Sequence, residues 1–375
     1  MSDQRRGSAP IDRTGMASLP LIALIAALIS MPVTAEPQPG NEPRARNVIL
    51  FVGDGMGLSS VNAASILGYR APQALYFHRM PHVAFADTSA AVQWVTDAAA
   101  AATAMATGRK TANSMVSAFP ADGAGESGNA AKTILEYAEE RGLSTGVISD
   151  SSLVNPLVSA FYAHQDDRSK FGAIFVQLLA PRFGDGVDIA IGPGRKAIWQ
   201  SIGERSGTLA SEFAAKGALL SDNLRDLDAA KSRRAVVVLD DPSFDLAATV
   251  EKTTTSLARN SKGFFLVVHS DCHLKDAERS LRCVLALDKI VQTTAEQHGA
   301  DTLVLVTADH AYALRTHDTR APKTDDFLSH VVVLDEHTGE EVPVLATGPG
   351  SDRVKGFVSN TKIFDWMMQA FGWRP

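Results

Sequence analysis

The chain has 375 residues, of which 45% are hydrophobic and 21% are charged, and its formal net charge is -6. This composition is too apolar and too weakly charged for a disordered protein, and an acidic balance without a long Lys/Arg run argues against nucleic acid as the main partner. Two cysteines cannot form a disulfide-rich scaffold, so a large buried core has to stabilise either one large α/β domain or two ordinary domains.

Residues 1–35 have the segment order of a secretory signal peptide. Three arginines precede an apolar run over residues 19–29, and small residues follow at 33–35. This order predicts cleavage after Ala35 and a periplasmic or secreted protein. The apolar run is shorter than the roughly 20 apolar residues that a membrane span needs, so we expect no membrane span.

Residues 36–46 are rich in Pro, Gly and charge, and this composition predicts a linker. The true start of the chain stays open between Met1 and Met16. No internal repeat or second change of composition follows the linker, so residues 47–375 are predicted to form a single domain.

From residue 47 onward, short apolar runs alternate with amphipathic stretches that are rich in alanine. The apolar runs predict strands at 48–52, 144–148, 187–191, 235–239, 263–269, 302–307, 330–334 and 342–347. The amphipathic stretches predict helices at 97–107, 129–141, 205–216, 245–259, 276–298 and 361–371. Continuous apolar strands are buried on both faces, which favours a three-layer α/β/α sandwich around a large, mostly parallel sheet.

Acidic and histidine residues follow directly after three of the predicted strands. They are Asp54, the segment 269–273, and the pair Asp309 and His310. The carboxyl ends of parallel strands meet at one edge of a sheet, where open α/β folds place their sites. An aspartate after a strand is more often a helix cap, but three such strand ends together predict a metal site, because oxygen and imidazole ligands suit Zn²⁺ or similar ions.

Six ordered segments cover nearly the whole mature chain and resemble the alkaline phosphatase family. They are NVILFVGDGMG at 47–57, VTD at 95–97 with AMATGRKT at 104–111, DIAIGPGRK at 188–196, KGFFLVV at 262–268, TADHA at 307–311 and HTGE at 337–340. The resemblance implies a secreted phosphomonoesterase with two zinc ions, a nearby Mg²⁺, an attacking serine and an arginine that binds phosphate. It also implies a homodimer.

The resemblance assigns roles residue by residue. Asp54, Asp309 and His310 match the protein ligands of the zinc ion on the nucleophile side. His337 matches a histidine of the other zinc ion, and Arg168 matches the arginine that binds phosphate.

The loop after Val268 is several residues shorter than the family's loop. Counting back from Asp288 in the following helix places His273 on a zinc histidine and lets Asp271 replace the zinc aspartate. Counting forward from Phe265 supplies neither ligand. We prefer the count from the helix, because deletions fall in loops and not in packed helices.

The same alignment argues against the magnesium site. His269 stands where the family has a magnesium-binding glutamate, and Leu157 stands where a hydroxyl ligand is expected, whereas Mg²⁺ requires oxygen ligands. Cys272 lies inside the altered loop, so a thiolate ligand and a disulfide with Cys283 are both open.

The largest departure is at the nucleophile. The family reads Thr-Asp-Ser-Ala-Ala, but this chain reads Thr-Asp-Ala-Ala-Ala at 96–100, and Ala98 has no oxygen to attack phosphorus. The loss excludes a phosphoserine route but not hydrolysis by water. Two functions remain: a metal-dependent phosphomonoester hydrolase of reduced or altered activity, and a non-catalytic pseudophosphatase that binds metal or phosphate-like anions or partners an active paralogue.

The polar residues near Arg168 in the sequence are not expected to bind metal or substrate. His164 is expected to be a structural histidine and not a ligand. Asp166 and Asp167 are interpreted as a solvated charge run, with orientation of the arginine as the alternative.

Overall fold

The computed structural model describes residues 44–120, 130–229, 234–317, 323 and 326–374. The predicted signal peptide and all of the predicted linker up to residue 43 lie outside the described residues. At the linker's end, the Ala45 amide already donates a hydrogen bond to the carbonyl of Ala370. No helix among the described residues is long and apolar enough to cross a membrane.

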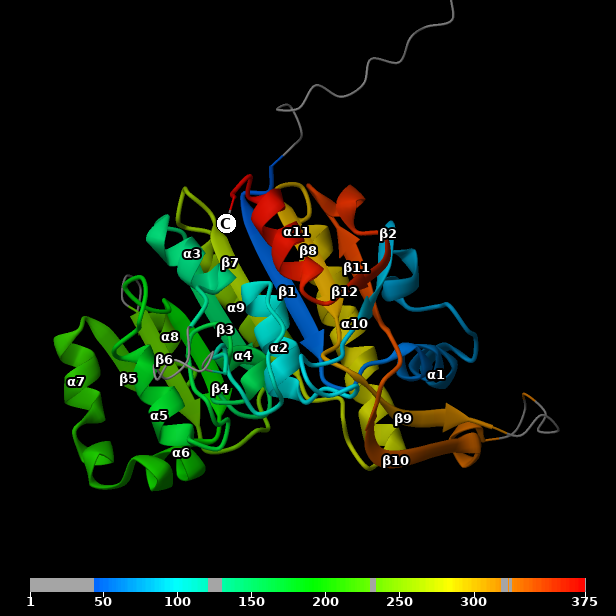
Figure 1. Ribbon diagram of the computed structural model, residues 1–375, viewed down its shortest axis with the longest axis horizontal. Coiled ribbons are helices and arrows are strands. Elements are labelled where there is room, and N and C mark those ends of the chain that lie inside the picture. The colour runs from blue at the N-terminus through cyan, green and yellow to red at the C-terminus, as the bar shows by residue number, and fades with distance from the viewer. Residues whose placement is uncertain (1–43, 121–129, 230–233, 318–322, 324–325, 375) are drawn as a thin grey trace, which may run out of the picture. The chain divides into compact units, whose positions relative to one another are not determined.

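A large sheet lies at the centre of the unit that spans Pro43–Pro375 (Figure 1). Its ten strands run in the order β12 (Gly356–Ser359), β2 (His82–Asp87), β11 (Val342–Thr347), β8 (Thr302–Thr307), β1 (Asn47–Gly53), β7 (Phe264–Ser270), β3 (Ser144–Ser149), β4 (Ile189–Pro193), β6 (Arg234–Leu239) and β5 (Ala218–Ser221). Every neighbouring pair is parallel except those of β11, which runs antiparallel to β2 and β8. The prediction of a large, mostly parallel sheet is confirmed.

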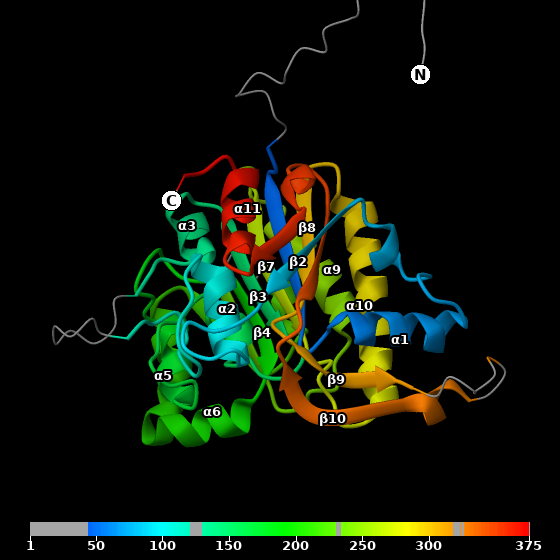
Figure 2. The ribbon, with the colours of Figure 1, turned by 45° about the vertical axis from the view of Figure 1, so that its right-hand side comes forward.

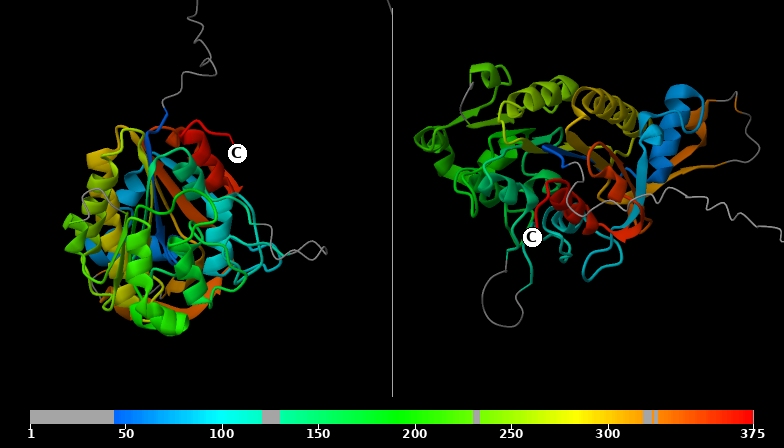
Figure 3. Two further views of the ribbon diagram at one scale, coloured as in Figure 1. Left: turned by 90° about the vertical axis from the view of Figure 1, so that its left-hand side faces the viewer. Right: turned by 90° about the horizontal axis from the view of Figure 1, so that it is seen from above.

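Helices cover both faces of the sheet, so the predicted three-layer arrangement is also confirmed (Figures 2 and 3). One face carries α1 (Leu58–Tyr69), α9 (Leu246–Leu257) and α10 (Ala277–His298). The other carries α2 (Ala98–Thr107), α3 (Ile134–Glu140), α4 (Pro156–Ser159) and α11 (Lys362–Ala370). The remaining helices are α5 (Phe171–Phe175), α6 (Arg195–Ile202), α7 (Leu209–Ala215) and α8 (Asp226–Ala229).

Two predicted helices differ from the structure at their ends or in their continuity. The helix predicted at 129–141 begins only after Thr133, because a capping box stops it there: the Thr133 hydroxyl accepts from the amide of Glu136, whose carboxylate accepts from the Thr133 amide. The helix predicted at 205–216 is divided into a 3₁₀ turn over Gly203–Gly207 and the short helix α7.

The strand predicted at 330–334 exists but lies outside the main sheet. It forms β10 (Val331–Thr338), whose one partner among the described strands is β9 (Ala311–Thr316), in an antiparallel two-stranded sheet. A two-stranded sheet leaves one face to solvent, so Val332 and Leu334 are exposed. The strand predicted at 187–191 is shifted by two residues and forms β4.

The central strands fix the positions of the residues that follow them. Val52 of β1 pairs in register with His269 of β7 and with Thr307 of β8. All three strands are fully buried along their length. Because they are parallel and in register, the chain leaves all three at the same edge of the sheet.

Candidate active site

The turn after β1 is tied to the turns after β7 and β8. The Asp54 amide donates to the carbonyl of Ser270 over 2.9 Å, and the Gly55 amide donates to Oδ1 of Asp309 over 3.0 Å. Gly55 has a φ of +66°, and a Cβ at this position would lie 3.0 Å from the Tyr312 ring. The turn therefore requires glycine, both for its backbone conformation and for space.

Asp54, Asp309 and His310 form the first candidate metal group. One ligand atom of each lies within 4.8 Å of the others. The Nε2 atom of His310 is 3.1 Å from Oδ2 of Asp309 and 3.7 Å from Oδ1 of Asp54. Asp309 is fully buried and His310 is nearly so. The structure thus brings together the three residues that the sequence assigned to one metal.

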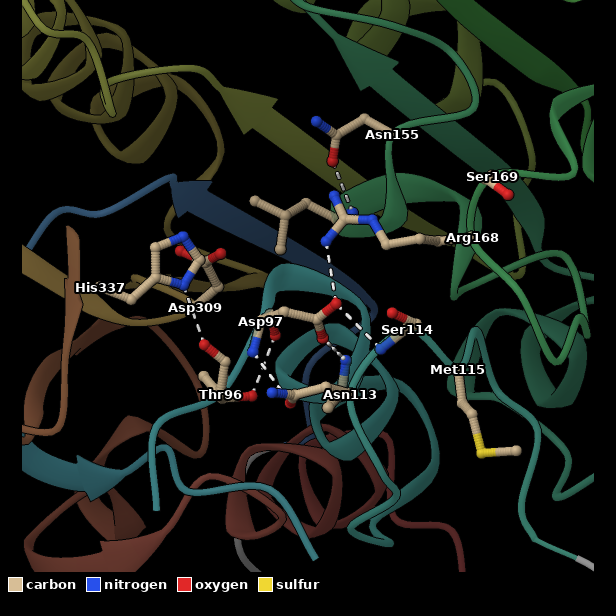
Figure 4. A network of polar contacts seen from close by, with 12 residues as sticks. Thr96, Asp97, Asn113, Ser114, Met115, Asn155, Arg168, Ser169, Asp309 and His337 are labelled. Atoms are coloured by element: carbon tan, nitrogen blue, oxygen red, sulfur yellow. Dashed lines mark hydrogen bonds and ion pairs between the residues drawn. The ribbon is translucent and has the colours of Figure 1, made fainter. Parts of the chain in front are cut away.

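His273, His310 and His337 form the second candidate group, again with ligand atoms within 4.8 Å of one another. The Nδ1 atom of His337 bonds to the carbonyl of Thr96 over 2.9 Å, as Figure 4 shows, and that of His310 bonds to the carbonyl of Ala311 over 3.1 Å. A carbonyl on one ring nitrogen fixes the tautomer and leaves Nε2 free to bind metal.

The charges of the first group depend on one another. Burial alone would raise the pKa of Asp54, but the nearby His269 and His310 hold that pKa well below its ordinary value. Burial alone would lower the pKa of His310, but Asp309 and Asp54 raise it to about 9. Two buried carboxylates therefore need positive charge beside them, which either a proton or a metal ion can supply.

The unsatisfied polar atoms at this edge fit a metal ion. An unpaired buried polar atom costs about 1–3 kcal/mol, so a cluster of them points to a missing partner. Five buried atoms without a hydrogen bond gather here: Asp54 Oδ1, His269 Nε2, His273 Nε2, Asp309 Oδ2 and His310 Nε2. The last two face each other as an ion pair. Carboxylate oxygen with imidazole nitrogen is a donor set that suits Zn²⁺.

Asp271 and His269 lie beside these groups but belong to neither. The Asp271 amide donates to Oδ1 of Asp150, and burial with the charge of Asp54 raises the pKa of the Asp271 carboxyl to about 6. His269 bonds through Nδ1 to the hydroxyl of Ser149, and its Nε2 lies 3.7 Å from Oδ2 of Asp54. Ligand roles for Asp271 and His269 stay predictions.

Arg168 lies beside the amino end of α2 and is held there by Asp97 (Figure 4). The guanidinium donates to Oδ2 of Asp97 over 3.0 Å, and the same oxygen accepts from the Ser114 amide. The other carboxylate oxygen of Asp97 caps α2 by accepting from the Ala100 amide. Ala98 is the first residue of that helix, so free N–H groups of the first turn face the place where an anion would bind.

The family of the chain follows from a comparison with known protein families. The model of the alkaline phosphatase family matches residues 45–331, which is more than half of the chain. The chain belongs to the alkaline phosphatase family.

Two alkaline phosphatase relatives match over most of their length. A streptomycin-6-phosphate phosphatase of Streptomyces griseus is 29% identical, over 98% of this chain and 99% of that protein. The alkaline phosphatase of Escherichia coli K12 is 28% identical, over 88% of this chain and 86% of that protein.

Solved alkaline phosphatases share the fold. A cold-active enzyme from Shewanella has a TM-score of 0.73 at 25% identity and covers 87% of this chain and 99% of its own. The enzyme from the Antarctic bacterium TAB5 has a TM-score of 0.75 at 22% identity and covers 89% of this chain and 100% of its own.

Sequence reasoning assigned no role to Asp97, although this residue orients the candidate phosphate-binding arginine. Its position directly before the nucleophile position, at the cap of a helix, was the available signal. Asp166 and Asp167 do not take this role: Asp166 pairs with the exposed Lys170, and Asp167 accepts from Ser169. They form the solvated charge run that the sequence indicated.

Three further residues have structural roles. His164 is buried, 2.7 Å from the Glu136 carboxylate through Nε2 and 2.8 Å from the Ser117 carbonyl through Nδ1, so both ring nitrogens are used. Cys272 and Cys283 form a disulfide, which leaves no thiolate for a metal. This bond ties the loop that carries His273 to α10.

Asp335 was also missed. It lies on β10 two residues before His337, and its Oδ1 atom is 3.7 Å from Nε2 of His273. The predicted strand ended at residue 334, whereas β10 continues to Thr338, so the prediction stopped short of both Asp335 and His337.

Proposed function

We propose that this member of the alkaline phosphatase family is a zinc-dependent hydrolase of small phosphate monoesters that turns over slowly, with water as the nucleophile. Asp54, Asp309 and His310 would hold one zinc ion, and His273 and His337 would contribute to holding a second. Zinc bound there would neutralise the charge of the phosphoryl group and activate the attacking water.

One observation carries the proposal. A continuous chain of contacts runs from His337 to the Thr96 carbonyl, along the backbone to Asp97, and from the Asp97 carboxylate to Arg168 (Figure 4). It links the candidate metal groups to a cation whose planar fork suits two phosphate oxygens. A phosphate ester bound between them would also face the amino end of α2.

In this site, water would form the new bond to phosphorus as the ester P–O bond breaks. The alcohol would leave with a proton, and inorganic phosphate would remain against Arg168. Ala98 supplies no competing nucleophile, so no covalent enzyme intermediate forms. Asp97 keeps the guanidinium in place through the reaction.

The missing hydroxyl sets the expected rate. Loss of the nucleophile in a serine hydrolase lowers turnover by about 10⁶, yet positioning and electrostatics retain roughly 10³–10⁴ over water. The candidate metal groups, Asp97 and Arg168 are all in place. Slow hydrolysis is therefore the expected activity. The absence of a hydroxyl at Ala98 also favours an alternative function, a pseudophosphatase that binds metal or phosphate-like anions or partners an active paralogue.

The experiment compares the parent with Ala98→Ser, using zinc-loaded protein and a chromogenic phosphate monoester. We expect slow hydrolysis that a chelator abolishes, and a rise in kcat of at least about 100-fold in Ala98→Ser. Ala100→Ser is the matched control, because it adds the same hydroxyl two residues further along α2 and should not raise the rate. A parent with no chelator-sensitive activity establishes the pseudophosphatase alternative.

We further infer export to the periplasm or the medium and assembly as a homodimer. The disulfide between Cys272 and Cys283 supports export, because such bonds persist in oxidising compartments. The dimer is supported by the family resemblance. Cell fractionation and sedimentation of the purified protein test the two statements separately.

A further inference from the structure

The second candidate metal group is short of ligands. His310 belongs to both groups, but its Nδ1 is bonded to the Ala311 carbonyl, so only Nε2 can bind metal. One imidazole nitrogen has one lone pair and binds one ion. If His310 joins Asp54 and Asp309, the second ion is left with two imidazoles, whereas catalytic zinc sites use three protein ligands.

We propose that Asp335 is the carboxylate ligand of the second metal ion, an inference that rests on the proposed metal-dependent function. Its Oδ1 atom lies 3.7 Å from Nε2 of His273, an atom that is buried and has no hydrogen-bond partner. One ion between these two atoms would bind both, since zinc ligands lie about 2 Å from the metal. The ligand set becomes His273, His337 and Asp335.

The backbone of β10 directs Asp335 toward this position. The pairing of β10 with β9 shifts register between Val333 and His337, so residues 334–336 form an irregular segment next to the site. Such irregularities re-aim side chains near active sites. Asp335 lies in this segment, two residues before His337, and the 3.7 Å distance from its Oδ1 atom to Nε2 of His273 places it beside the second group.

The other acidic candidate lies beside the first group, because the Asp271 carboxyl interacts with Asp54 and His269 and bonds to the Ser151 side chain. Asp271 precedes Cys272, and its backbone amide bonds to Asp150 at the ends of β3 and β7. Asp271 and Asp335 both lie outside the two candidate groups, and the contact with His273 is what distinguishes Asp335. Asp335 also forms an ion pair through Oδ2 with Lys275 over 2.8 Å, and that lysine side chain is 80% exposed. An exposed ion pair is weak because water screens it, so it leaves the carboxylate free to bind an ion.

The test measures zinc binding by the mature protein, stripped and reloaded, in competition with a chromogenic chelator. We expect the parent to bind two ions and Asp335→Asn to bind one of them more than about 100-fold more weakly, beyond the roughly 10–100-fold that loss of a residue hydrogen-bonded to a metal ligand causes. Cobalt substitution gives a second readout, because loss of a ligand changes the visible absorption of that ion. Asp335 is exposed, so thermal unfolding should show an intact fold.

Three control variants make the result specific. Glu336→Gln removes the neighbouring exposed charge, and Asp271→Asn removes the competing carboxylate; both should bind zinc within about threefold of the parent. Lys275→Ala should bind zinc as tightly as the parent or more tightly, because it frees Asp335 from its ion pair. A loss in Lys275→Ala equal to that in Asp335→Asn would show that the ion pair acts as a structural unit and would overturn the proposal.

The remaining outcomes separate this inference from the proposed function. A parent that binds two ions while Asp335→Asn binds both as tightly overturns the ligand role of Asp335 alone. A parent that binds no zinc overturns the ligand role together with the metal-dependent function. Weakened binding in Asp335→Asn, in a parent without phosphatase activity, supports the ligand role and rejects only hydrolysis.

Discussion

The buried carboxyl of Glu139 should make the free energy of unfolding fall as pH rises. This residue of α3 is 7% exposed, and its carboxylate accepts from the Gly186 amide over 2.8 Å and from the Thr145 hydroxyl over 3.2 Å. Burial, reinforced by the charges of Asp185 and Asp188, raises the pKa of Glu139 from 4.5 to about 8. The folded protein therefore holds a proton that the unfolded chain releases.

The sign and size of the effect follow from this difference. Stability from the retained proton is fully present below about pH 4.5 and is lost as pH rises to about 8. At about 1.36 kcal/mol per pH unit, a window of about 3.5 units corresponds to at most about 5 kcal/mol. Domains are typically stable by about 5–15 kcal/mol, so even half of this amount is measurable.

Urea unfolding of chelator-treated protein at about pH 5 and about pH 8.5 measures the effect. Glu139→Gln keeps a neutral side chain of the same shape, so it should lose about 2–4 kcal/mol less than the parent between these pH values. Glu140→Gln is the matched control, because Glu140 is exposed and pairs with Lys132. Parallel losses in the parent and Glu139→Gln, within about 0.5 kcal/mol, would refute the buried-proton argument.

Two other substitutions test the site and its support. Arg168→Ala should weaken inhibition by inorganic phosphate about 10–100-fold, the equivalent of a charged hydrogen bond of about 1.5–3 kcal/mol; Arg168→Lys should recover only part of this, because it keeps the charge but not the fork. An unchanged inhibition constant would contradict the phosphate-binding role. Replacing Cys272 and Cys283 by serine should lower the free energy of unfolding by about 3 kcal/mol, since the bond closes a loop with a sequence separation of 11. Urea unfolding checks this, and a loss below about 0.5 kcal/mol would contradict it.

The parts of the fold that the sequence predicted well are those buried on both faces. β1, β7 and β8 were predicted to within one residue at each end. Each contains a continuous apolar run, which is the pattern of a strand buried on both faces. β2 and β12 were missed. β2 alternates buried and exposed positions over only six residues, and β12 is a four-residue edge strand whose Phe357 is exposed against Phe85.

At the site, local motifs were predicted and pairings across the fold were not. Asp54, Asp309 and His310 follow from strand ends that must meet in a parallel sheet. Asp335 was not considered, because its approach to His273 depends on the pairing of β10 with β9 outside the main sheet. Nothing in the local sequence specifies that tertiary pairing.

The disulfide has a consequence for how the protein matures. Cys272 stands between Asp271 and His273, in the loop that supplies a candidate ligand. A reduced chain offers zinc a soft thiolate at this point, and Zn²⁺ binds thiolates readily. Oxidation to Cys283 removes that competitor. If the bond forms before zinc binds, the thiolate of Cys272 cannot join the ligand set, so an oxidising compartment would favour binding through His273.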